Sequence, residues 1–258
     1  MTSVKQLFDL TGRVSVVTGG ATGLGLQMAT ALAEAGSNVV ICSRKLENCE
    51  HAAHGLEKLD VKALALACDV TRVDQVEAMK DAVMQKFGRV DVLVNNAGRA
   101  WVAPPEDTPL ECWQQVFDFN ITAPFICAQV LGREMIKAQR GRIINIASVA
   151  GLVGRDAKTY NSIAYCASKG ALVNFTRDLA VKWAHHNIRV NAICPGFFVT
   201  PLNEKMLEQT RDYVLRGIPL GRTGGPDDLK GIVVLLASDA SNFMTGAIIP
   251  VDGGATAW

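Results

Sequence analysis

The chain has 258 residues, of which 49% are hydrophobic and 20% are charged, so it can bury a sizeable core and lacks the composition of a disordered protein. It carries 26 Lys and Arg against 25 Asp and Glu, a balance that argues against a nucleic-acid-binding surface and against a polybasic membrane signal. Because it begins without an apolar signal-peptide core and has no apolar run long enough to span a bilayer, we expect a cytoplasmic protein.

Short β-branched apolar runs alternate with longer helical patterns along the chain. The apolar runs predict strands at Val14–Thr18, Asn38–Ser43, Lys62–Ala67, Val90–Asn95, Arg142–Ala147, Ile188–Cys194 and Ala247–Val251. The intervening stretches predict helices, among them Leu24–Ala35, Val73–Phe87, Pro124–Ala138 and Ile163–His185. Strands that are apolar on both faces and alternate with helices indicate a parallel sheet covered on both sides. We predict a single doubly wound α/β domain over residues 1–258, with seven parallel strands.

The cysteines and histidines give no metal-binding pattern. There are seven Cys, an odd number without a Cys-x-x-Cys pair, and most lie in apolar runs, which predicts reduced thiols in a reducing compartment. His51 and His54 could share one side of a helix, but no cluster of Cys or carboxylates accompanies them. We therefore predict no metal site.

A glycine-rich turn follows the first predicted strand. The segment that leads into the next helix reads Thr18-Gly19-Gly20-Ala21-Thr22-Gly23-Leu24-Gly25. Glycines allow a backbone to approach a pyrophosphate closely, and a helix amino terminus supplies unpaired N–H groups and a positive dipole end. The spacing T-G-x-x-x-G-x-G departs from G-x-G-x-x-G, because Met28 stands where the last glycine would be. The position of the turn at the first strand–helix junction predicts dinucleotide binding rather than a purely structural turn.

The end of the second predicted strand indicates which nicotinamide cofactor is bound. NAD sites of this kind usually place an acidic residue there, on the ribose hydroxyls. Here the strand ends in Cys42-Ser43-Arg44-Lys45, and the next acidic residue is Glu47. Arg44, aided by Ser43 and Lys45, could pair with a 2′-phosphate, although both cations could also be solvated loop charges. We predict a preference for NADP(H), with NAD(H) as the alternative.

Tyr165 and Lys169 form a candidate catalytic pair. Their i, i+4 spacing places a phenol and an ammonium on one face of a helix. Because an ordinary tyrosine has a pKa near ~10, acid–base work near pH 7 needs a shift worth ~4 kcal/mol, which a neighbouring cation and an oxidised nicotinamide would favour. Neither Tyr160 nor Tyr213 has a lysine four residues later. Ser148 follows the fifth predicted strand, at the carboxyl edge where open α/β sheets bind ligands.

The sequence resembles the short-chain dehydrogenase/reductase family over essentially the whole chain. The family's marks occur in order: the turn of residues 18–25, Asp69-Val70 after the third strand, Asn95-Asn96-Ala97-Gly98 after the fourth, then Asn120, Ser148, Tyr165, Lys169, and Pro195-Gly196 with Thr200. Each mark alone is weak, but the ordered set is specific. The resemblance implies a Rossmann-type fold, a nicotinamide cofactor and carbonyl/alcohol redox chemistry.

The resemblance also implies a role for each of these residues. Tyr165 would donate or accept the proton, and Ser148 would hydrogen-bond the substrate carbonyl. Lys169 would lower the pKa of Tyr165 and bind the nicotinamide ribose, Asn120 would hold a water in a proton relay, and Asp69 would bind the adenine. The residues implied to bind the cofactor are Gly19, Thr22, Gly23, Leu24, Gly25, Ser43, Arg44, Lys45, Asp69, Val70, Asn96, Ala97, Gly98, Tyr165, Lys169, Pro195, Gly196 and Thr200.

Two spacings narrow the subfamily. Enoyl reductases of this superfamily generally have a longer spacing between Tyr and Lys than the three residues present here, which favours reduction of C=O over C=C. The 16 residues between Ser148 and Tyr165 exceed the family's common spacing, so residues 154–164 are interpreted as a short insertion beside the active site. With the segments 174–177 and 191–198, the chain is similar to the gluconate 5-dehydrogenase and 3-oxoacyl reductase branch.

The sequence leaves the substrate open. We expect residues 99–103, 149–164 and 197–220 to build the pocket, where Arg99, Arg155 and Lys158 would suit an anionic substrate unless these cations are solvated. The predicted partner is a small carbonyl or alcohol. The alternatives are an NAD-dependent polyol or hydroxy-acid dehydrogenase and, disfavoured because a binder needs no phenol–ammonium pair, a nucleotide-sensing homologue without turnover. Family members are commonly tetramers, which implies a homotetramer.

Overall fold

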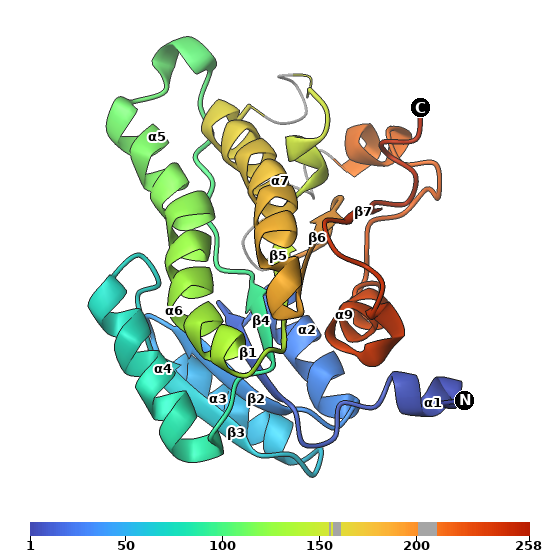
Figure 1. Cartoon of the computed structure of the whole chain (residues 1–258). Coiled ribbons are helices and arrows are strands. Elements are labelled where there is room, and N and C mark those ends of the chain that lie inside the picture. The colour runs from blue at the N-terminus through green and yellow to red at the C-terminus, as the bar shows by residue number, and fades with distance from the viewer. Residues whose placement is uncertain (155, 157–160, 201–210) are drawn as a thin grey trace.

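The computed structural model describes residues 1–154, 156, 161–200 and 211–258. Within them, seven parallel strands form one sheet in the order β3-β2-β1-β4-β5-β6-β7 (Figure 1). The strands are β1 (Val14–Thr18), β2 (Asn38–Ser43), β3 (Ala63–Ala67), β4 (Val92–Asn95), β5 (Gly141–Ile146), β6 (Ile188–Pro195) and β7 (Ile248–Val251). The α-helices are α1 (Val4–Leu7), α2 (Gly23–Glu34), α3 (Leu46–Glu57), α4 (Val73–Phe87), α5 (Leu110–Phe117), α6 (Ala123–Lys137), α7 (Ile163–Trp183) and α9 (Lys230–Ala237).

Helices cover both faces of the sheet, which confirms the doubly wound Rossmann-type architecture. One face packs against α2, α3 and α9, with Leu32 of α2 fully buried in that layer. The other face packs against α4, α6 and α7, with Val83 of α4 fully buried there. Successive residues of a strand alternate between the layers, so that Val17 of β1 contacts the first and Val16 the second. This two-sided burial is the reason for the continuous apolar strands in the sequence.

The predicted strand boundaries agree with the structure to within two residues. The largest difference is at β4, which was predicted to begin at Val90 and begins at Val92. At this end the Asp91 carboxylate, rather than a backbone carbonyl, accepts the N–H of Val14 at 2.9 Å. The Asp91 side chain therefore takes the place of a backbone carbonyl in the hydrogen bonding between β1 and the segment just before β4.

The strand order places a crevice at one edge of the sheet. From β1 the chain proceeds through α2 to β2 on one side, whereas β4 to β7 lie on the other side of β1. The helices that follow β1 and β4 pack on opposite faces. In open α/β sheets such a reversal leaves a ligand-binding crevice beyond the carboxyl ends of these two strands.

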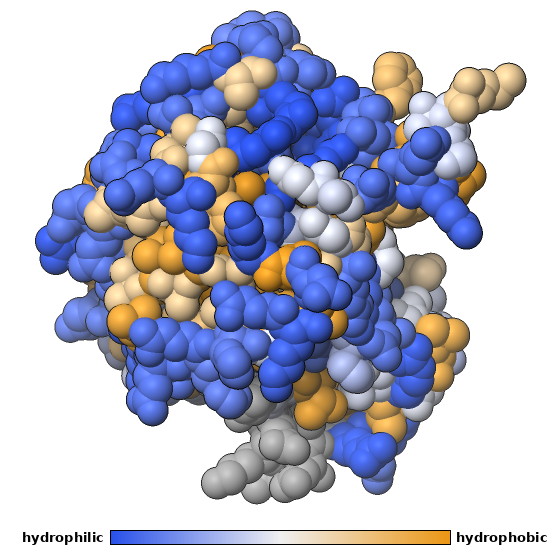
Figure 2. Space-filling model, turned by 90° about the horizontal axis from the view of Figure 1, so that it is seen from below, coloured by the Kyte–Doolittle hydropathy of each residue, from blue (hydrophilic) through white to orange (hydrophobic). Residues whose placement is uncertain are grey.

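The opposite side of the molecule presents a largely hydrophilic surface. Figure 2 views it from below Figure 1, from the side where α4 and α6 end, and shows hydrophobic residues in smaller groups between polar ones. No helix in the described part of the chain is long and apolar enough to cross a membrane.

Candidate active site

The glycine-rich turn joins β1 to α2 at the crevice. Gly19 and Gly23 have φ values of +63° and +54°, in the left-handed region that favours glycine. A Cβ on Gly25 would lie 2.5 Å from Nδ2 of Asn96 and closer still to the carbonyl oxygen of Gly19. The turn therefore cannot accommodate a side chain at Gly25 without moving.

The amino terminus of α2 is free of competing anions. Thr22 is the N-cap residue, its side chain makes no capping hydrogen bond among the described residues, and the first turn of α2 contains no acidic residue. The first N–H groups of a helix lack intrahelical acceptors and carry a partial positive charge. Leu24 lies in this first turn of α2. A Cβ on Gly23 would lie 3.7 Å from Cγ2 of Thr200, so Thr200 lies beside the glycine-rich turn. This arrangement suits an anionic ligand such as a pyrophosphate.

Asn96 and Thr18 tie the end of β4 to the glycine-rich turn. Nδ2 of Asn96 donates to the carbonyl oxygens of Thr18 at 2.9 Å and of Gly19 at 3.1 Å. Oγ1 of Thr18 accepts the backbone N–H groups of Asn96 and Ala97, each at 3.0 Å. The role of Thr18 was not predicted, although a hydroxyl at the last position of β1 was the available signal.

The side chains of Ser148 and Tyr165 contact each other just beyond the carboxyl end of β5. Ser148 caps the short 3-10 turn Val149–Gly151, where its Oγ accepts the N–H of Ala150 at 3.1 Å. Tyr165 lies in the first turn of α7 and is hydrogen-bonded to the Ser148 side chain. Burial raises the pKa of Tyr165 above its ordinary value, and the hydrogen bond with Ser148 partly opposes this rise. The phenol is therefore protonated at neutral pH in the protein alone.

Lys169 lies one helical turn after Tyr165 and is 4% exposed. Its Nζ donates to the carbonyl oxygen of Ile146 at 2.7 Å and lies 5.6 Å from the centre of the Tyr165 ring. Burial lowers the pKa of Lys169 to about 8, so the ammonium is mostly protonated at pH 7. A cation is thus held beside the phenol by helix α7 and the end of β5.

Asn120 holds a loop of the site through its side chain. It is fully buried in the π-helical turn Asp118–Thr122 between α5 and α6. Its Oδ1 accepts the N–H of Arg99 at 2.8 Å, and its Nδ2 donates to the carbonyl oxygen of Arg99 and to Oγ of Ser168, both at 2.9 Å. Sequence reasoning missed Ser168, which is also fully buried; a serine three residues after Tyr165 on the same helix was the available signal.

The catalytic candidates converge around Gly98. A Cβ on Gly98 would lie 3.1 Å from Oδ1 of Asn120 and 3.7 Å from Nζ of Lys169. Together with the contacts of Ser148 and Tyr165, this brings the four predicted residues to the carboxyl edge of β4 and β5.

The end of β2 lies further along the same edge. Arg44 is exposed, and its guanidinium carbon lies 5.5 Å from the centre of the Phe119 ring, next to Asn120. Oγ of Ser43 donates to the carbonyl oxygen of Lys45 at 3.1 Å and accepts its N–H at 3.3 Å, so Ser43 is engaged within its own turn. Sequence reasoning did not predict Phe119.

The end of β3 lies beside the end of β2, because Cys68 donates its N–H to the carbonyl oxygen of Ser43 at 2.9 Å. Oδ1 of Asp69 accepts the N–H of Thr71 at 3.0 Å and its hydroxyl at 2.7 Å, and Val70 is buried. One carboxylate oxygen of Asp69 is thus used locally.

Pro195 and Gly196 complete the predicted set at the end of β6. The N–H of Gly196 donates to the carbonyl oxygen of Val251 at 3.0 Å, and a Cβ there would lie 2.8 Å from Cα of Asp252. Of the predicted substrate pocket, residues 155, 157–160 and 201–210 lie outside the described residues. Among the described ones, no three His, Cys, Asp or Glu residues gather as a metal site.

Known proteins resemble the chain over nearly its whole length. A family model described as enoyl-(acyl carrier protein) reductase matches residues 19–256. The 3-oxoacyl-[acyl-carrier-protein] reductase of Thermotoga maritima is 38% identical over 245 residues, which cover 95% of this chain and 98% of that protein. The NAD-dependent glycerol dehydrogenase of Listeria innocua is 37% identical over 250 residues, which cover 96% of each chain.

A solved structure from Beutenbergia cavernae is also similar. It is described as an NAD(P)-dependent gluconate 5-dehydrogenase with bound NADP at low occupancy. The two chains are 34% identical and superpose with a TM-score of 0.91, over 98% of this chain and 100% of the other.

Proposed function

Since the chain belongs to the short-chain dehydrogenase/reductase family, whose named relatives act on CH–OH and C=O groups, we propose that it transfers a hydride between NADP(H) and a secondary alcohol or its ketone, with Tyr165 as general acid/base. The observation that carries this proposal is the half-buried Tyr165, whose side chain is hydrogen-bonded to Ser148 and whose ring lies beside the Lys169 ammonium. A protein that only binds nucleotides has no use for this arrangement.

The residues at the crevice suit a dinucleotide. The glycine-rich turn and the uncapped amino terminus of α2 would hold the pyrophosphate, and Asp69 with Val70 would contact the adenine. Asn96 to Gly98, Pro195, Gly196 and Thr200 would line the rest of the site. When bound, NADP(H) would supply or accept the hydride.

The phenol of Tyr165 would carry the proton. In reduction, its O–H would protonate the substrate's carbonyl oxygen while the Ser148 hydroxyl donates a hydrogen bond to the same oxygen; in oxidation the phenolate would take the alcohol proton. The Lys169 cation would favour the phenolate. Since both N–H groups of the Asn120 side chain are already bonded, the relay water would bind Oδ1 or the backbone oxygen of Asn120.

The preference for NADP(H) rests on Arg44. No acidic residue follows β2 before Glu47, and the guanidinium of Arg44 stacks on Phe119 at the site's edge. This holds a cation where a 2′-phosphate would be recognised. The runner-up is an NAD-dependent polyol or hydroxy-acid dehydrogenase, which the name of the Listeria innocua relative favours.

A homotetramer is the proposed assembly. Phe243 and Trp258 expose 106% and 81% of their reference surface, as large hydrophobic residues at a subunit interface do in an isolated chain. Light scattering coupled to size-exclusion chromatography should give four times the mass of the chain, 27.7 kDa. A monomer at micromolar concentration would contradict this assembly.

A screen of ketones and alcohols with both cofactors tests the function. We expect oxidation of NADPH, faster than that of NADH, with ketones, and no turnover of substrates that offer only a C=C bond. Faster turnover with NADH would support the runner-up. Cofactor binding without turnover of any carbonyl or alcohol would instead favour the nucleotide-sensing homologue.

A further inference from the structure

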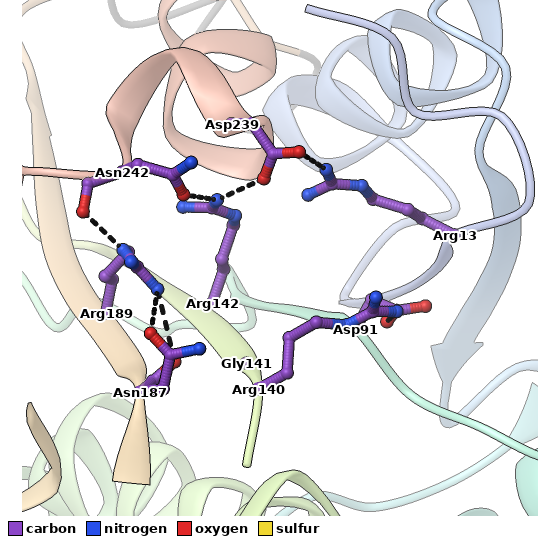
Figure 3. Close-up of a pocket in the computed structure, with 9 residues that line it drawn as sticks. All are labelled: Arg13, Asp91, Arg140, Gly141, Arg142, Asn187, Arg189, Asp239 and Asn242. Atoms are coloured by element: carbon purple, nitrogen blue, oxygen red, sulfur yellow. Dashed lines mark hydrogen bonds and ion pairs between the residues drawn. The ribbon is translucent and has the colours of Figure 1, made fainter. Parts of the chain in front are cut away.

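A pocket lies at the amino-terminal edge of the sheet, the edge opposite the one where Tyr165 lies. Figure 3 shows the side chains that line it. We call it the amino-edge pocket. Its volume is about 240 Å³, and its charged walls are four arginines and two aspartates: Arg13, Arg140, Arg142, Arg189, Asp91 and Asp239. The residues come from the starts of β1, β5 and β6, from the segment before β4 and from the segment after α9. At ~3.3 Å per strand residue, this edge is roughly 20 Å from the catalytic one.

The two carboxylates are shared between guanidinium groups. Asp239 forms ion pairs with Arg13 at 2.7 Å and with Arg142 at 2.9 Å. Asp91 pairs with Arg140, and its other oxygen is used by a backbone N–H. The single negative charge of Asp239 is therefore shared by two arginines. The Asp91 carboxylate also accepts a hydrogen bond from the first residue of β1.

Arg189 adds a further positive charge. In the described part of the chain it has no carboxylate partner, and it donates to the carbonyl oxygen of Asn242 at 2.7 Å and to Oδ1 of Asn187 at 3.0 Å. The walls of the amino-edge pocket thus carry two more positive than negative charges. Burial, and to a smaller extent the charges of Arg13 and Arg189 nearby, lowers the pKa of Arg142 to about 10.

Several N–H donors of these arginines are unused. Each guanidinium has five N–H groups. Among the described residues, Nε of Arg13, Nε of Arg142, and Nε and Nη1 of Arg140 make no hydrogen bond. The Arg142 side chain is only 7% exposed and lies between Asn242 and Asp239 in Figure 3, so it is held in place by its partners.

We propose that the amino-edge pocket binds a small oxyanion, either inorganic phosphate or the phosphoryl group of a small metabolite. Guanidinium groups bind phosphate oxygens through paired, charge-assisted hydrogen bonds. The pocket is far larger than the ~30 Å³ of one water and smaller than the ~300–1,000 Å³ of pockets for larger ligands, which suits one anionic group. A bound dianion cancels the surplus of two positive charges.

Calorimetric titration of the full-length protein with inorganic phosphate, at constant ionic strength set by chloride, tests the proposal. Arg140→Gln and Arg189→Gln each remove one cation from the wall, and Asp91 keeps its pair with Arg89 at 2.8 Å when Arg140 is changed. We expect each variant to weaken phosphate binding at least about tenfold, the effect of one charge-assisted contact, without changing turnover. The matched control is Arg133→Gln, which removes an exposed arginine paired with Glu77.

Two further titrations test whether the ligand is free phosphate or a phosphorylated metabolite, and at which edge of the sheet it binds. Glycerol 3-phosphate replaces inorganic phosphate in one arm: tighter binding than phosphate identifies a phosphorylated metabolite as the ligand, and weaker binding identifies the free ion. Arg44→Ala serves in the other arm, because Arg44 lies at the catalytic edge and should leave phosphate binding unchanged. The proposal is overturned if phosphate binds no better than chloride, or if neither Arg140→Gln nor Arg189→Gln weakens its binding.

Discussion

Burial of the Lys169 ammonium should lower the stability of the folded protein, and Lys169→Met should recover part of that loss. The pKa of Lys169 falls from 10.5 to about 8 on burial, which corresponds to about 3 kcal/mol at pH 7. Methionine keeps an unbranched apolar chain but gives up the charge-assisted hydrogen bond to Ile146, worth roughly 1.5 kcal/mol. We therefore expect the variant to be about 2 kcal/mol more stable at pH 7, with Tm higher by about 4–8 °C, and to be inactive.

The pH dependence identifies the cause of this gain. Between pH 8 and 10.5 the unfolded chain binds more protons at this lysine than the folded protein does, so wild-type stability rises with pH. The advantage of Lys169→Met should consequently shrink to about zero near pH ~9.5. Urea unfolding of both proteins at the two pH values measures it, with Lys182→Met, at an exposed position of α7, as a control that should show no such trend. A variant less stable than wild type at pH 7, or a gain that does not change with pH, would refute the reasoning.

Three other substitutions test separate parts of the site. Arg44→Ala should weaken NADP(H) binding by about 10- to 150-fold and leave NAD(H) binding unchanged in a fluorescence titration; equal losses for both would contradict the role of Arg44. Gly25→Ala places a Cβ against the Gly19 carbonyl and should weaken both cofactors by roughly 5- to 150-fold, so unchanged affinity would mean that the turn moves freely. Asn120→Ala removes the hydrogen bonds that this side chain makes with Ser168 and with the backbone of Arg99, and it should lower the free energy of unfolding in urea by about 2–4 kcal/mol; a loss within error would show that water replaces the side chain.

The fold can be predicted from the sequence because each strand and helix has its own pattern of apolar residues within a short segment of the chain. The continuous apolar pattern of Val14–Thr18 and its neighbours reflects burial on both faces, and the Tyr165–Lys169 spacing is a property of one helix. The contact of Arg44 with Phe119 and that of Asn120 with Ser168 join distant segments, and no local pattern encodes them.

The pKa shifts of the residues in the site could not be predicted from the sequence either. The Tyr–Lys spacing indicates a phenol with a lowered pKa, whereas burial raises the pKa of Tyr165 and lowers that of Lys169 in the protein alone. Desolvation depends on how completely α7 is covered, which spacing does not reveal. The same holds for the amino-edge pocket, whose four arginines come from three separate places in the chain, the starts of β1, β5 and β6, and no local pattern links these places.

The rate of hydride transfer in Tyr165→Phe tests the central claim most directly. The substitution removes the transferable proton and keeps the ring, so kcat with the best substrate of the screen should fall by ~10²- to 10⁴-fold while the Kd for NADP(H) changes by no more than about twofold. A variant that retains more than about 10% of the wild-type kcat would contradict the assignment of Tyr165 as the general acid/base.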